Sequence, residues 1–253
     1  MNSIQVTAFI PARYYSTRLP YKVLHKFDNK SMLQWVYETT SKAKGIDEVV
    51  IVTDHELVFK EAQTFGARVI MTSDKHLSGT DRIAEAASNF PETEVFINVQ
   101  GDQPFIEPAM IEKLIEPYLN SLKPDMATLS CPLKHTELKN PNTVKVAVNK
   151  QNRAMFFTRS PIPYFRNSVK KVPVYQHIGL YAYTAESLKR ISGLNSSALE
   201  LAEGLEQMRA LEEGLSIYVS TVNQSIPEIN TLEDIHHAIE MNLINNYTLF
   251  KEK

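Results

Sequence analysis

A short segment after the first apolar run of the chain carries three cationic side chains. Residues 10–22 read Ile-Pro-Ala-Arg-Tyr-Tyr-Ser-Thr-Arg-Leu-Pro-Tyr-Lys, so Arg13, Arg18 and Lys22 share one loop. In α/β proteins, a loop that directly follows an apolar strand presents ligand contacts at the carboxyl end of that strand. Arginine grips phosphate oxygens with its planar fork and lysine acts as a mobile point charge, so this mixture suits a polyphosphate with its metal. A solvated basic surface loop is the alternative.

A second segment with chemical potential is Gln100-Gly101-Asp102, which follows the apolar run 95–99. Glycine lets the backbone approach a ligand closely, and the carboxylate of Asp102 supplies the hard oxygen that Mg²⁺ prefers. Because the carboxyl ends of parallel strands share one edge of a sheet, we expect this segment beside the cationic loop. An ordinary turn aspartate is the alternative.

Two further groups of residues could either bind a ligand or serve a structural role. Ser78, Gly79 and Thr80 precede a predicted helix, where backbone donors and hydroxyls could hold a ligand or simply cap the helix. Arg159 follows an apolar run, and His177 and Tyr181 bracket a predicted strand, so that together they could line a pocket for an acidic sugar. Singly, a histidine at a strand edge and a tyrosine are more often structural residues.

Composition limits the class of protein. The chain has 253 residues, of which 43% are hydrophobic, so it can bury a full core. The net charge of -2 argues against a nucleic-acid partner, which usually requires a basic excess. The single cysteine, Cys131, excludes an intramolecular disulfide and fits a reducing compartment as a buried bystander. With no signal-like start and no apolar run long enough for a membrane span, we expect a cytoplasmic protein without membrane insertion.

The front half alternates strand-like and helical patterns, which is typical of βαβ units. Ser31 and Asp54 are expected to cap two helices that close at Gly45 and Gly66, and Pro108 is expected to open a later helix. The predicted strands cover 6–10, 48–53, 68–71 and 95–99, and a further helix covers 81–89. These elements predict an α/β fold with a doubly wound, mainly parallel sheet.

The back half is less regular, and its predicted strands are separated by proline-containing stretches. The predicted strands cover 126–131, 144–148, 155–158, 178–183 and 217–222, and the predicted helices cover 198–213 and 232–245. No linker rich in glycine or serine divides the chain. We therefore expect a single domain over 1–253 with an inserted smaller lobe at approximately 130–185.

Taken together, the ordered motifs resemble the 3-deoxy-manno-octulosonate (Kdo) cytidylyltransferases, or CMP-Kdo synthetases, of lipopolysaccharide synthesis. The match covers nearly the whole chain through short pieces at compatible spacing. The pieces are 10–13, 16–20, Thr53-Asp54, Ser78-Gly79-Thr80-Asp81-Arg82, 98–102, 177–181 and 205–211. The resemblance implies a nucleotide-diphospho-sugar transferase-like fold and CMP transfer from CTP to the anomeric hydroxyl of Kdo, with pyrophosphate as the second product.

The resemblance also implies roles by position. The expected nucleotide-binding residues are Pro11, Ala12, Arg13, Arg18, Lys22, Ser78, Gly79, Thr80 and Gln100, and the expected catalytic residues among the charged groups are Arg13, Arg18, Lys22 and Asp102. The expected sugar-binding residues are Arg159, His177, Tyr181, Glu206 and Gln207, and the expected Mg²⁺ ligands are Asp102 and Asn230. From residue pattern alone, Glu206 and Gln207 would be an ordinary exposed helical pair. The resemblance further implies a homodimer that uses the inserted lobe.

Three positions depart from the family pattern. Tyr21 stands where the family usually has glycine, which takes a positive φ at little cost. Asn230 stands where the family has its second acidic metal ligand, so metal affinity should fall unless another group such as Glu228 completes the site. Gln176 replaces a frequent basic residue before the histidine and could alter how the sugar carboxylate is held.

These departures leave alternatives to an active Kdo enzyme. One is a cytidylyltransferase for a related acidic sugar such as amino-Kdo or a sialic acid. The other is a catalytically impaired regulatory protein that binds CTP without turnover, which Asn230 favours.

Overall fold

The computed structural model describes residues 4–76, 78–166 and 172–251. The chain forms two compact units. The first joins the front of the chain, up to Glu112, to its last segment, which starts at Ile226, and the second runs from Lys113 to Ser225. Among the described residues, no helix is both long enough and apolar enough to cross a bilayer.

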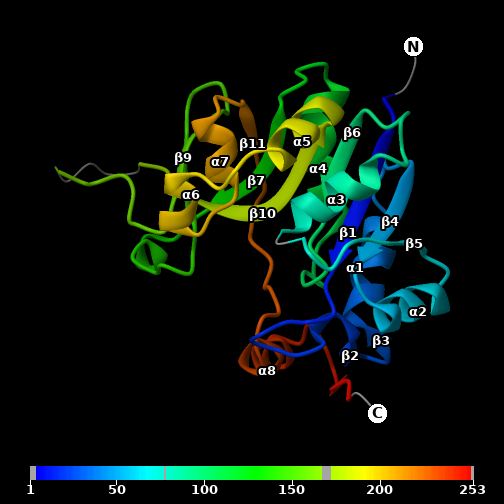
Figure 1. Ribbon diagram of the computed structural model, residues 1–253. Helices are drawn as coiled ribbons and strands as arrows, with labels where there is room; N and C mark the ends of the chain where they lie inside the picture. The colour runs from blue at the N-terminus through cyan, green and yellow to red at the C-terminus, as the bar shows by residue number, and fades with distance from the viewer. Residues whose placement is uncertain (1–3, 77, 167–171, 252–253) are drawn as a thin grey trace. The chain divides into compact units, whose positions relative to one another are not determined.

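The first unit is built on a parallel sheet whose strands run in the order β6-β1-β4-β5 (Figure 1). The strands are β1 (Val6–Ala12), β4 (Glu48–Thr53), β5 (Arg68–Met71) and β6 (Val95–Asn98). Every residue of β1 is buried, as expected for a central strand that is covered on both faces. The predicted parallel α/β arrangement is therefore confirmed, and the ends of β1 and β6 share one edge.

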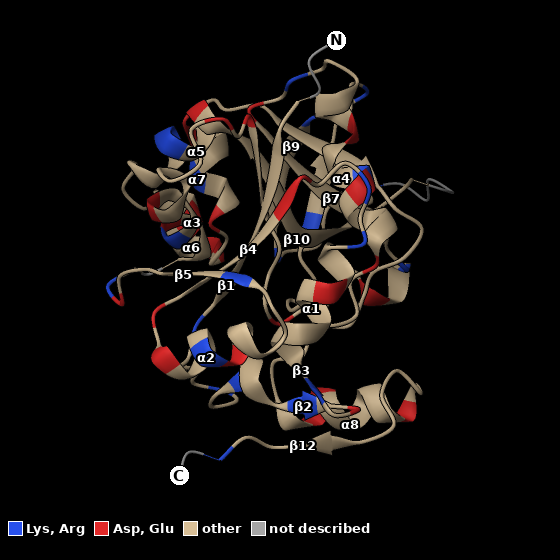
Figure 2. Cartoon of the chain, turned by 90° about the vertical axis from the view of Figure 1, so that its right-hand side faces the viewer, with Lys and Arg blue, Asp and Glu red and all other residues tan. Residues whose placement is uncertain are grey.

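Helices link these strands close to the predicted positions, except that the first helix ends at Thr40 and not at the predicted Gly45. They are α1 (Met32–Thr40), α2 (Glu56–Thr64), α3 (Gly79–Ala87) and α4 (Pro108–Leu119). Ser31 caps α1 as predicted, but the prediction that Asp54 caps α2 is wrong, because the ring of His55 accepts the Leu57 N–H instead. Basic and acidic residues both occur along α2 (Figure 2), and the Lys60 ammonium lies 3.3 Å from the Glu56 carboxylate.

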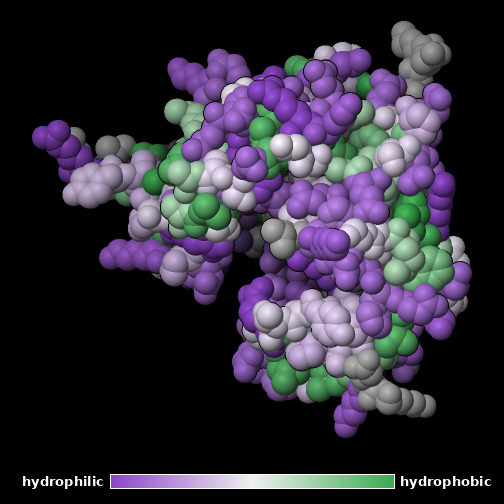
Figure 3. All heavy atoms as spheres, in the orientation of Figure 1, coloured by the Kyte–Doolittle hydropathy of each residue, from purple (hydrophilic) through white to green (hydrophobic). Residues whose placement is uncertain are grey.

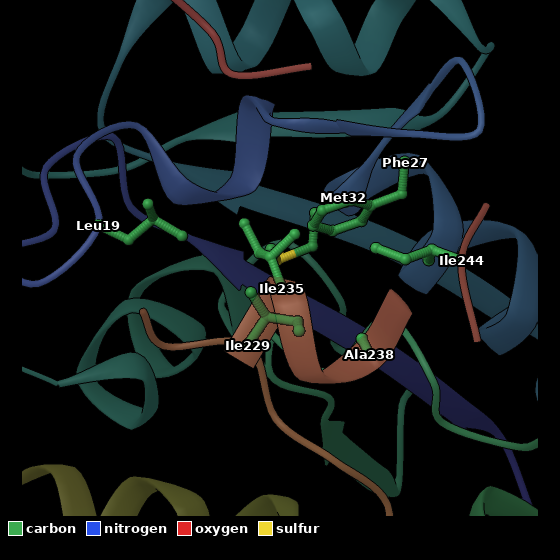
Figure 4. Packing of buried hydrophobic residues seen from close by; sticks show 7 residues of the cluster. All are labelled: Leu19, Phe27, Met32, Ile229, Ile235, Ala238 and Ile244. Carbon is green, nitrogen blue, oxygen red and sulfur yellow. The ribbon is translucent and has the colours of Figure 1, made fainter. Parts of the chain in front are cut away.

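The last segment of the chain packs against the loops that follow β1. The helix α8 (Leu232–Glu240) ends earlier than predicted, because Asn242 adopts a left-handed φ of 57°. A small antiparallel sheet joins β12 (Tyr247–Thr248) to β2 (Lys26–Phe27) and β3 (Lys30–Ser31), beside the short 3₁₀ helix η1 (Lys22–Leu24). Figure 4 shows Ile229 and Ile235 facing Leu19 and Met32 within one buried cluster. This apolar contact fixes the segment before α8 against the cationic loop.

The second unit contains a mixed sheet. Its strands are β7 (Met126–Pro132), β8 (Lys145–Val148), β9 (Ala154–Thr158), β10 (Tyr175–Thr184) and β11 (Ile217–Thr221). β11 runs parallel to β7, whereas the β7–β10, β10–β8 and β8–β9 pairs are antiparallel. Two elements flank the strands, namely η2 (His135–Glu137) and α5 (Ala185–Ser192). Cys131 is a buried free thiol on β7, as predicted, and burial raises its pKa.

One long helix was predicted over 198–213, and this prediction is wrong. The segment forms α6 (Ala198–Glu203) and α7 (Gln207–Glu212), separated at Gly204, whose φ is +63°. Ser197 and Glu200 form a capping box at the start of α6, so the short helix is closed at both ends by local chemistry. The break places Gln207 at the start of its own helix.

Replacing Gly204 with alanine should isolate the cost of this break. An added Cβ would meet no atom within 4 Å, so the only penalty is the left-handed backbone, about 1 kcal/mol of unfolding free energy. Gly179→Ala in the same unit is the control, because its Cβ also meets open space and its φ is not positive. Urea denaturation measures both variants, and equal stabilities would contradict the expectation.

Candidate functional site

A pocket of about 370 Å³ lies in the first unit, over the ends of β1 and β6. Its lining includes the predicted metal ligand Asp102 and six of the nine predicted nucleotide-binding residues, namely Pro11, Arg13, Arg18, Lys22, Gly79 and Gln100. The lining also includes Tyr15, Ser16 and Thr17 of the same loop. Tyr15 is 75% exposed, although it is a large aromatic residue, and was missed as a candidate because nothing in its spacing distinguishes it.

Lys22 is a buried cation of the loop that two other segments of the chain hold in place. It is 9% exposed, and its ammonium donates to the carboxylate of Asp102 at 2.6 Å and to the Asn230 Oδ1 at 3.0 Å. The Arg18 guanidinium donates to the same Asn230 oxygen at 2.9 Å. Three segments far apart in the sequence therefore meet at one polar centre, as was predicted for Asp102 and the cationic loop.

The loop keeps a glycine-like path although Tyr21 occupies the position. Tyr21 adopts φ 58° and ψ 27°, in the left-handed region. This conformation costs a non-glycine residue roughly 1–2 kcal/mol. The Tyr21 ring packs on Tyr14 at 4.7 Å and meets the Phe250 ring edge-on at 5.7 Å, contacts that a glycine would lack. Aromatic packing thus offsets the backbone strain and delivers Lys22 to Asp102.

Two glycines allow the segments around the pocket to approach closely. A Cβ on Gly101 would lie 3.0 Å from the Pro11 carbonyl oxygen, and one on Gly79 would lie 3.1 Å from the Pro11 ring. Ser78 caps α3 by accepting the Asp81 N–H at 3.0 Å, which bears out its structural reading, and Thr80 is buried. Ala12 is the buried last residue of β1. Gly79 and Gly101 therefore line the pocket close to Pro11, whereas the predicted nucleotide-binding residues Ala12, Ser78 and Thr80 are not part of its lining.

A buried ion pair connects three of the sequence motifs. Arg82 is fully buried and donates to Asp54 at 2.8 Å and to the Thr72 hydroxyl at 2.5 Å. The other carboxylate oxygen of Asp54 accepts the backbone N–H of Tyr14 at 3.3 Å, next to Arg13. Asp54 therefore does not cap α2. Its carboxylate instead connects the backbone of the cationic loop to Arg82 on α3. Sequence reasoning missed this function, although both residues belonged to the recognised motifs.

A second carboxylate lies near Asn230. Glu228 accepts from the Gln103 amide at 3.1 Å and from the Asn230 Nδ2 at 3.4 Å. Burial, and then the nearby charge of Asp102, raise the pKa of Glu228, while the hydrogen bonds from Gln103 and Asn230 oppose that rise.

The oxygens of Asp102 and Asn230 fit a divalent cation. Both accept from the single ammonium of Lys22, so they converge on one position already suited to positive charge. Both are hard oxygen donors, which Mg²⁺ binds together with substrate phosphates. Among the described residues, no cluster of three or more His, Cys, Asp or Glu is arranged to hold a metal, so an all-protein cage is not formed there.

All five predicted sugar-binding residues lie in the second unit, and a hydrogen bond joins two of them directly. The Tyr181 hydroxyl donates to the Gln207 Oε1 at 3.1 Å. The buried Gln207 Nε2 has no hydrogen-bond partner within the described part of the chain. An unsatisfied buried donor is costly unless a ligand accepts from it, so this atom points to a binding function. Glu206 lies immediately before α7, next to Gln207.

His177 is a buried, neutral member of this group. Its Nε2 lies 2.9 Å from the Thr128 hydroxyl, whose proton is directed to the Leu180 carbonyl at 2.8 Å. With the Thr128 hydroxyl donating to a carbonyl, the matching tautomer is the one in which the ring donates through Nε2 and keeps Nδ1 as an acceptor. The rings of His177 and Tyr181 lie 5.6 Å apart, and burial lowers the pKa of His177 to about 3. The histidine can orient a hydroxyl but cannot supply a positive charge at neutral pH.

Arg159 is held by the backbone around it. Its N–H donates to the Glu203 carboxylate at 2.8 Å, and its guanidinium donates to the carbonyls of Glu203 at 2.8 Å and Pro141 at 3.0 Å. Lys145 is fully buried and donates to the Arg159 carbonyl at 2.6 Å. Burial, followed by the neighbouring Arg159 charge, lowers the pKa of Lys145.

A cation-lined pocket at the strand ends of a parallel α/β sheet is where proteins of this architecture bind their ligands, and comparisons with known proteins give the class. The cytidylyltransferase family model matches residues 7–217. A 3-deoxy-manno-octulosonate cytidylyltransferase from Acaryochloris marina is 44% identical over 236 residues, covering 93% of this chain and 96% of the relative. An 8-amino-3,8-dideoxy-manno-octulosonate cytidylyltransferase from Shewanella pealeana is 42% identical over 238 residues, covering 92% and 96%.

Solved structures agree with these relatives. The structure of a CMP:2-keto-3-deoxy-manno-octonic acid synthetase complexed with CTP matches with a TM-score of 0.90 and 38% identity, covering 94% of this chain and 98% of that one. The 4-diphosphocytidyl-2C-methyl-D-erythritol synthase of Anaerococcus prevotii shares the fold, with a TM-score of 0.64, 17% identity and coverage of 96% and 97%. The chain belongs to the 3-deoxy-manno-octulosonate cytidylyltransferases within the cytidylyltransferase family.

Replacing Asp54 with asparagine should weaken both the fold and nucleotide binding. The change leaves Arg82 buried without its counter-charge, which costs about 3 kcal/mol of unfolding free energy, and it loosens the Tyr14 anchor. We expect the Kd for CTP, measured by calorimetry, to rise on the order of tenfold. Thr7→Val is the control, because it removes a buried 2.7 Å hydrogen bond to Thr93 at the other end of β1. Equal CTP affinity in all three proteins would contradict the assignment.

His177 predicts an acid-dependent loss of stability. The unfolded chain binds a proton on this ring near pH 6.5, whereas the native ring resists it down to about pH 3. The free energy of unfolding should therefore decline as the pH falls through this window, by at most about 1.4 kcal/mol per pH unit from this residue. In His177→Gln, denaturation curves recorded between pH 7.5 and 4 should show a smaller pH slope. A slope equal to that of the native protein would refute the interpretation.

Proposed function

We propose that this protein transfers CMP from CTP to the anomeric hydroxyl of 3-deoxy-D-manno-octulosonate and releases pyrophosphate. The observation that supports this most is the meeting of Arg18, Lys22, Asp102 and Asn230 at one polar centre in the first-unit pocket. A relative with 38% identity has been solved with CTP. The named relatives act on this sugar acid or on its 8-amino form.

The reaction requires positioning rather than a covalent nucleophile. The anomeric oxygen forms a bond to the α-phosphorus of CTP, and the bond from that phosphorus to the bridging oxygen of the β-phosphate breaks. The electron pair leaves with pyrophosphate, and the hydroxyl proton passes to solvent. Negative charge grows on the leaving oxygens, so fixed cations beside the phosphates lower the barrier.

The first-unit residues match this demand. Arg13, Arg18 and Lys22 supply the positive charge on the phosphates, with Lys22 set by Asp102 and Arg18 set by Asn230. Pro11, Gly79 and Gln100 bring backbone and amide groups to the same pocket, where they would hold the nucleoside. Gln100 is oriented for this by donating to the Asn98 side chain at 2.8 Å.

Magnesium is the proposed cofactor. Asp102 and Asn230 would hold it through their oxygens. The bound ion would polarise the phosphoryl group and neutralise charge on the leaving pyrophosphate. Asp102 would supply the formal negative charge of this pair, and Asn230 would supply a neutral oxygen.

The second-unit residues suit a hydroxylated acid. The unsatisfied Gln207 Nε2 donates, the His177 Nδ1 accepts, and Tyr181 fixes the amide that carries the donor. Arg159 is proposed to meet the carboxylate, and Glu206 to accept a sugar hydroxyl. These roles rest on the residues' chemistry and on the family resemblance.

The proposal extends to assembly and location. Met155 is 63% exposed and Tyr164 is 89% exposed, so the inserted lobe offers apolar side chains for a homodimer contact. The face drawn in Figure 3 is otherwise largely hydrophilic, with separate green patches. A cytoplasmic enzyme that feeds lipopolysaccharide synthesis fits the buried free thiol of Cys131 and the use of CTP.

A pyrophosphate-release assay with CTP tests the proposed function. We expect release with Kdo during a Mg²⁺ titration, and we expect Asn230→Asp to lower the Mg²⁺ concentration needed by about tenfold, because it adds a charge to the site. The acceptor panel includes amino-Kdo and sialic acid. Amino-Kdo is the second candidate acceptor, because the Shewanella pealeana relative is named for the 8-amino sugar. No release from the native chain at any Mg²⁺ concentration, with recovery in Asn230→Asp, would instead support the regulatory CTP-binding protein.

A further inference from the structure

The side-chain amide of Asn230 lies between charges of opposite sign. At one end, its Oδ1 accepts from Lys22 at 3.0 Å and from Arg18 at 2.9 Å. At the other end, its Nδ2 donates to the Glu228 carboxylate at 3.4 Å. The amide is thus aligned with the local field, oxygen toward the cations and nitrogen toward the anion.

The orientation of the side chain matters for an asparagine in a way that it does not for an aspartate. An aspartate presents oxygen at both terminal positions, whereas an asparagine turned by half a rotation presents its N–H groups to the cations. The backbone of Asn230 is already fixed, because its N–H donates to Asp234 at 2.8 Å beside the capping box of α8. The side-chain torsion is the remaining freedom, and Glu228 selects the orientation that keeps the oxygen at the cation position.

Glu228 is itself held in place by buried groups. Its other oxygen accepts from Gln103, which is 1% exposed, and the intervening Ile229 N–H donates to the Asp102 carbonyl at 3.3 Å. The Ile229 side chain is fully buried in the apolar cluster of Figure 4. Glu228 itself is exposed, but its two carboxylate oxygens are fixed by the amides of the buried Gln103 and of Asn230.

We propose that Glu228 supplies, through Asn230, the negative charge that the second position of the divalent-cation site lacks in this chain. Glu228 is a positioning residue, and Asp102 and Asn230 are the groups that touch the ion. The site then has two negative charges. Asp102 carries the one that touches the ion, and Glu228 carries the one that acts through the Asn230 amide. This inference rests on the proposed function, because the cation in question is the one that accompanies CTP.

The test measures ion binding instead of turnover. Mn²⁺ serves as the probe, and its electron paramagnetic resonance signal is recorded for protein with CTP and without acceptor sugar. We expect Glu228→Gln to weaken protein-bound Mn²⁺ by roughly 10- to 100-fold, the usual range for a group that orients a metal ligand. The double variant Glu228→Gln/Asn230→Asp should recover most of this affinity, because the charge returns to position 230.

Controls separate this proposal from folding and from the proposed function. Glu38→Gln makes the same change at a carboxylate paired with Lys30 outside the pocket and should leave Mn²⁺ binding unchanged. Thermal melting of each variant identifies any that fails to fold, and recovery in the double variant supports the relay only if its melting temperature equals that of Glu228→Gln. Native Mn²⁺ affinity in Glu228→Gln would overturn the proposal while leaving the proposed function intact. A native protein that binds no Mn²⁺ with CTP would overturn both.

Discussion

The ammonium of Lys22, held between the Asp102 carboxylate and the Asn230 amide oxygen, is the interaction on which the first unit depends. It joins the loop after β1, the segment after β6 and the segment before α8. Three cations on one short loop repel one another, so a loop of this kind holds a defined shape only if oxygens on neighbouring segments neutralise it. The buried pair of Arg82 and Asp54 also holds this loop, because Asp54 accepts the backbone N–H of Tyr14. The phosphate-facing surface is thereby preorganised by the protein's own acceptors.

Much of this arrangement was predictable from sequence, and the failures share one physical cause. The apolar runs and Ser31 fix β1, β6 and the start of α1 through local periodicity and capping, so they were predicted correctly. Asp54 was misjudged because its local preference for capping loses to an ion pair with a residue 28 positions away. The division of 198–213 was missed because glycine is tolerated within a helix, and only its left-handed conformation here ends α6. Where local propensity is weak, contacts between residues distant in sequence decide which structure forms.

Two of the three departures from the family pattern, Tyr21 and Asn230, have a neighbouring group that offsets the change. Tyr21 accepts a left-handed backbone, and its ring is packed between Tyr14 and Phe250. Asn230 lacks a charge, and Glu228 stands two residues away with its carboxylate on the amide nitrogen. In both cases the replacement residue keeps the geometry of the site while a neighbour offsets what was lost. Such paired adjustments indicate that the shape of the pocket is maintained, which is more consistent with a working transferase than with a decaying one.

The predicted sugar-binding residues of the second unit are mostly neutral hydrogen-bonding groups. Burial keeps His177 uncharged, and Tyr181 and Gln207 are neutral. The ammonium of Lys145 donates to the Arg159 carbonyl. Arg159 is therefore the cation suited to an acid, and Lys145 and Glu203 fix its backbone from opposite sides. Under the proposed function, hydroxyl recognition would rest on these buried neutral groups, and an acceptor that lacks a matching hydroxyl would leave Gln207 or His177 unsatisfied. Selectivity among acidic sugars then follows from the penalty of an unpaired buried polar group, which exceeds the gain from one more surface charge.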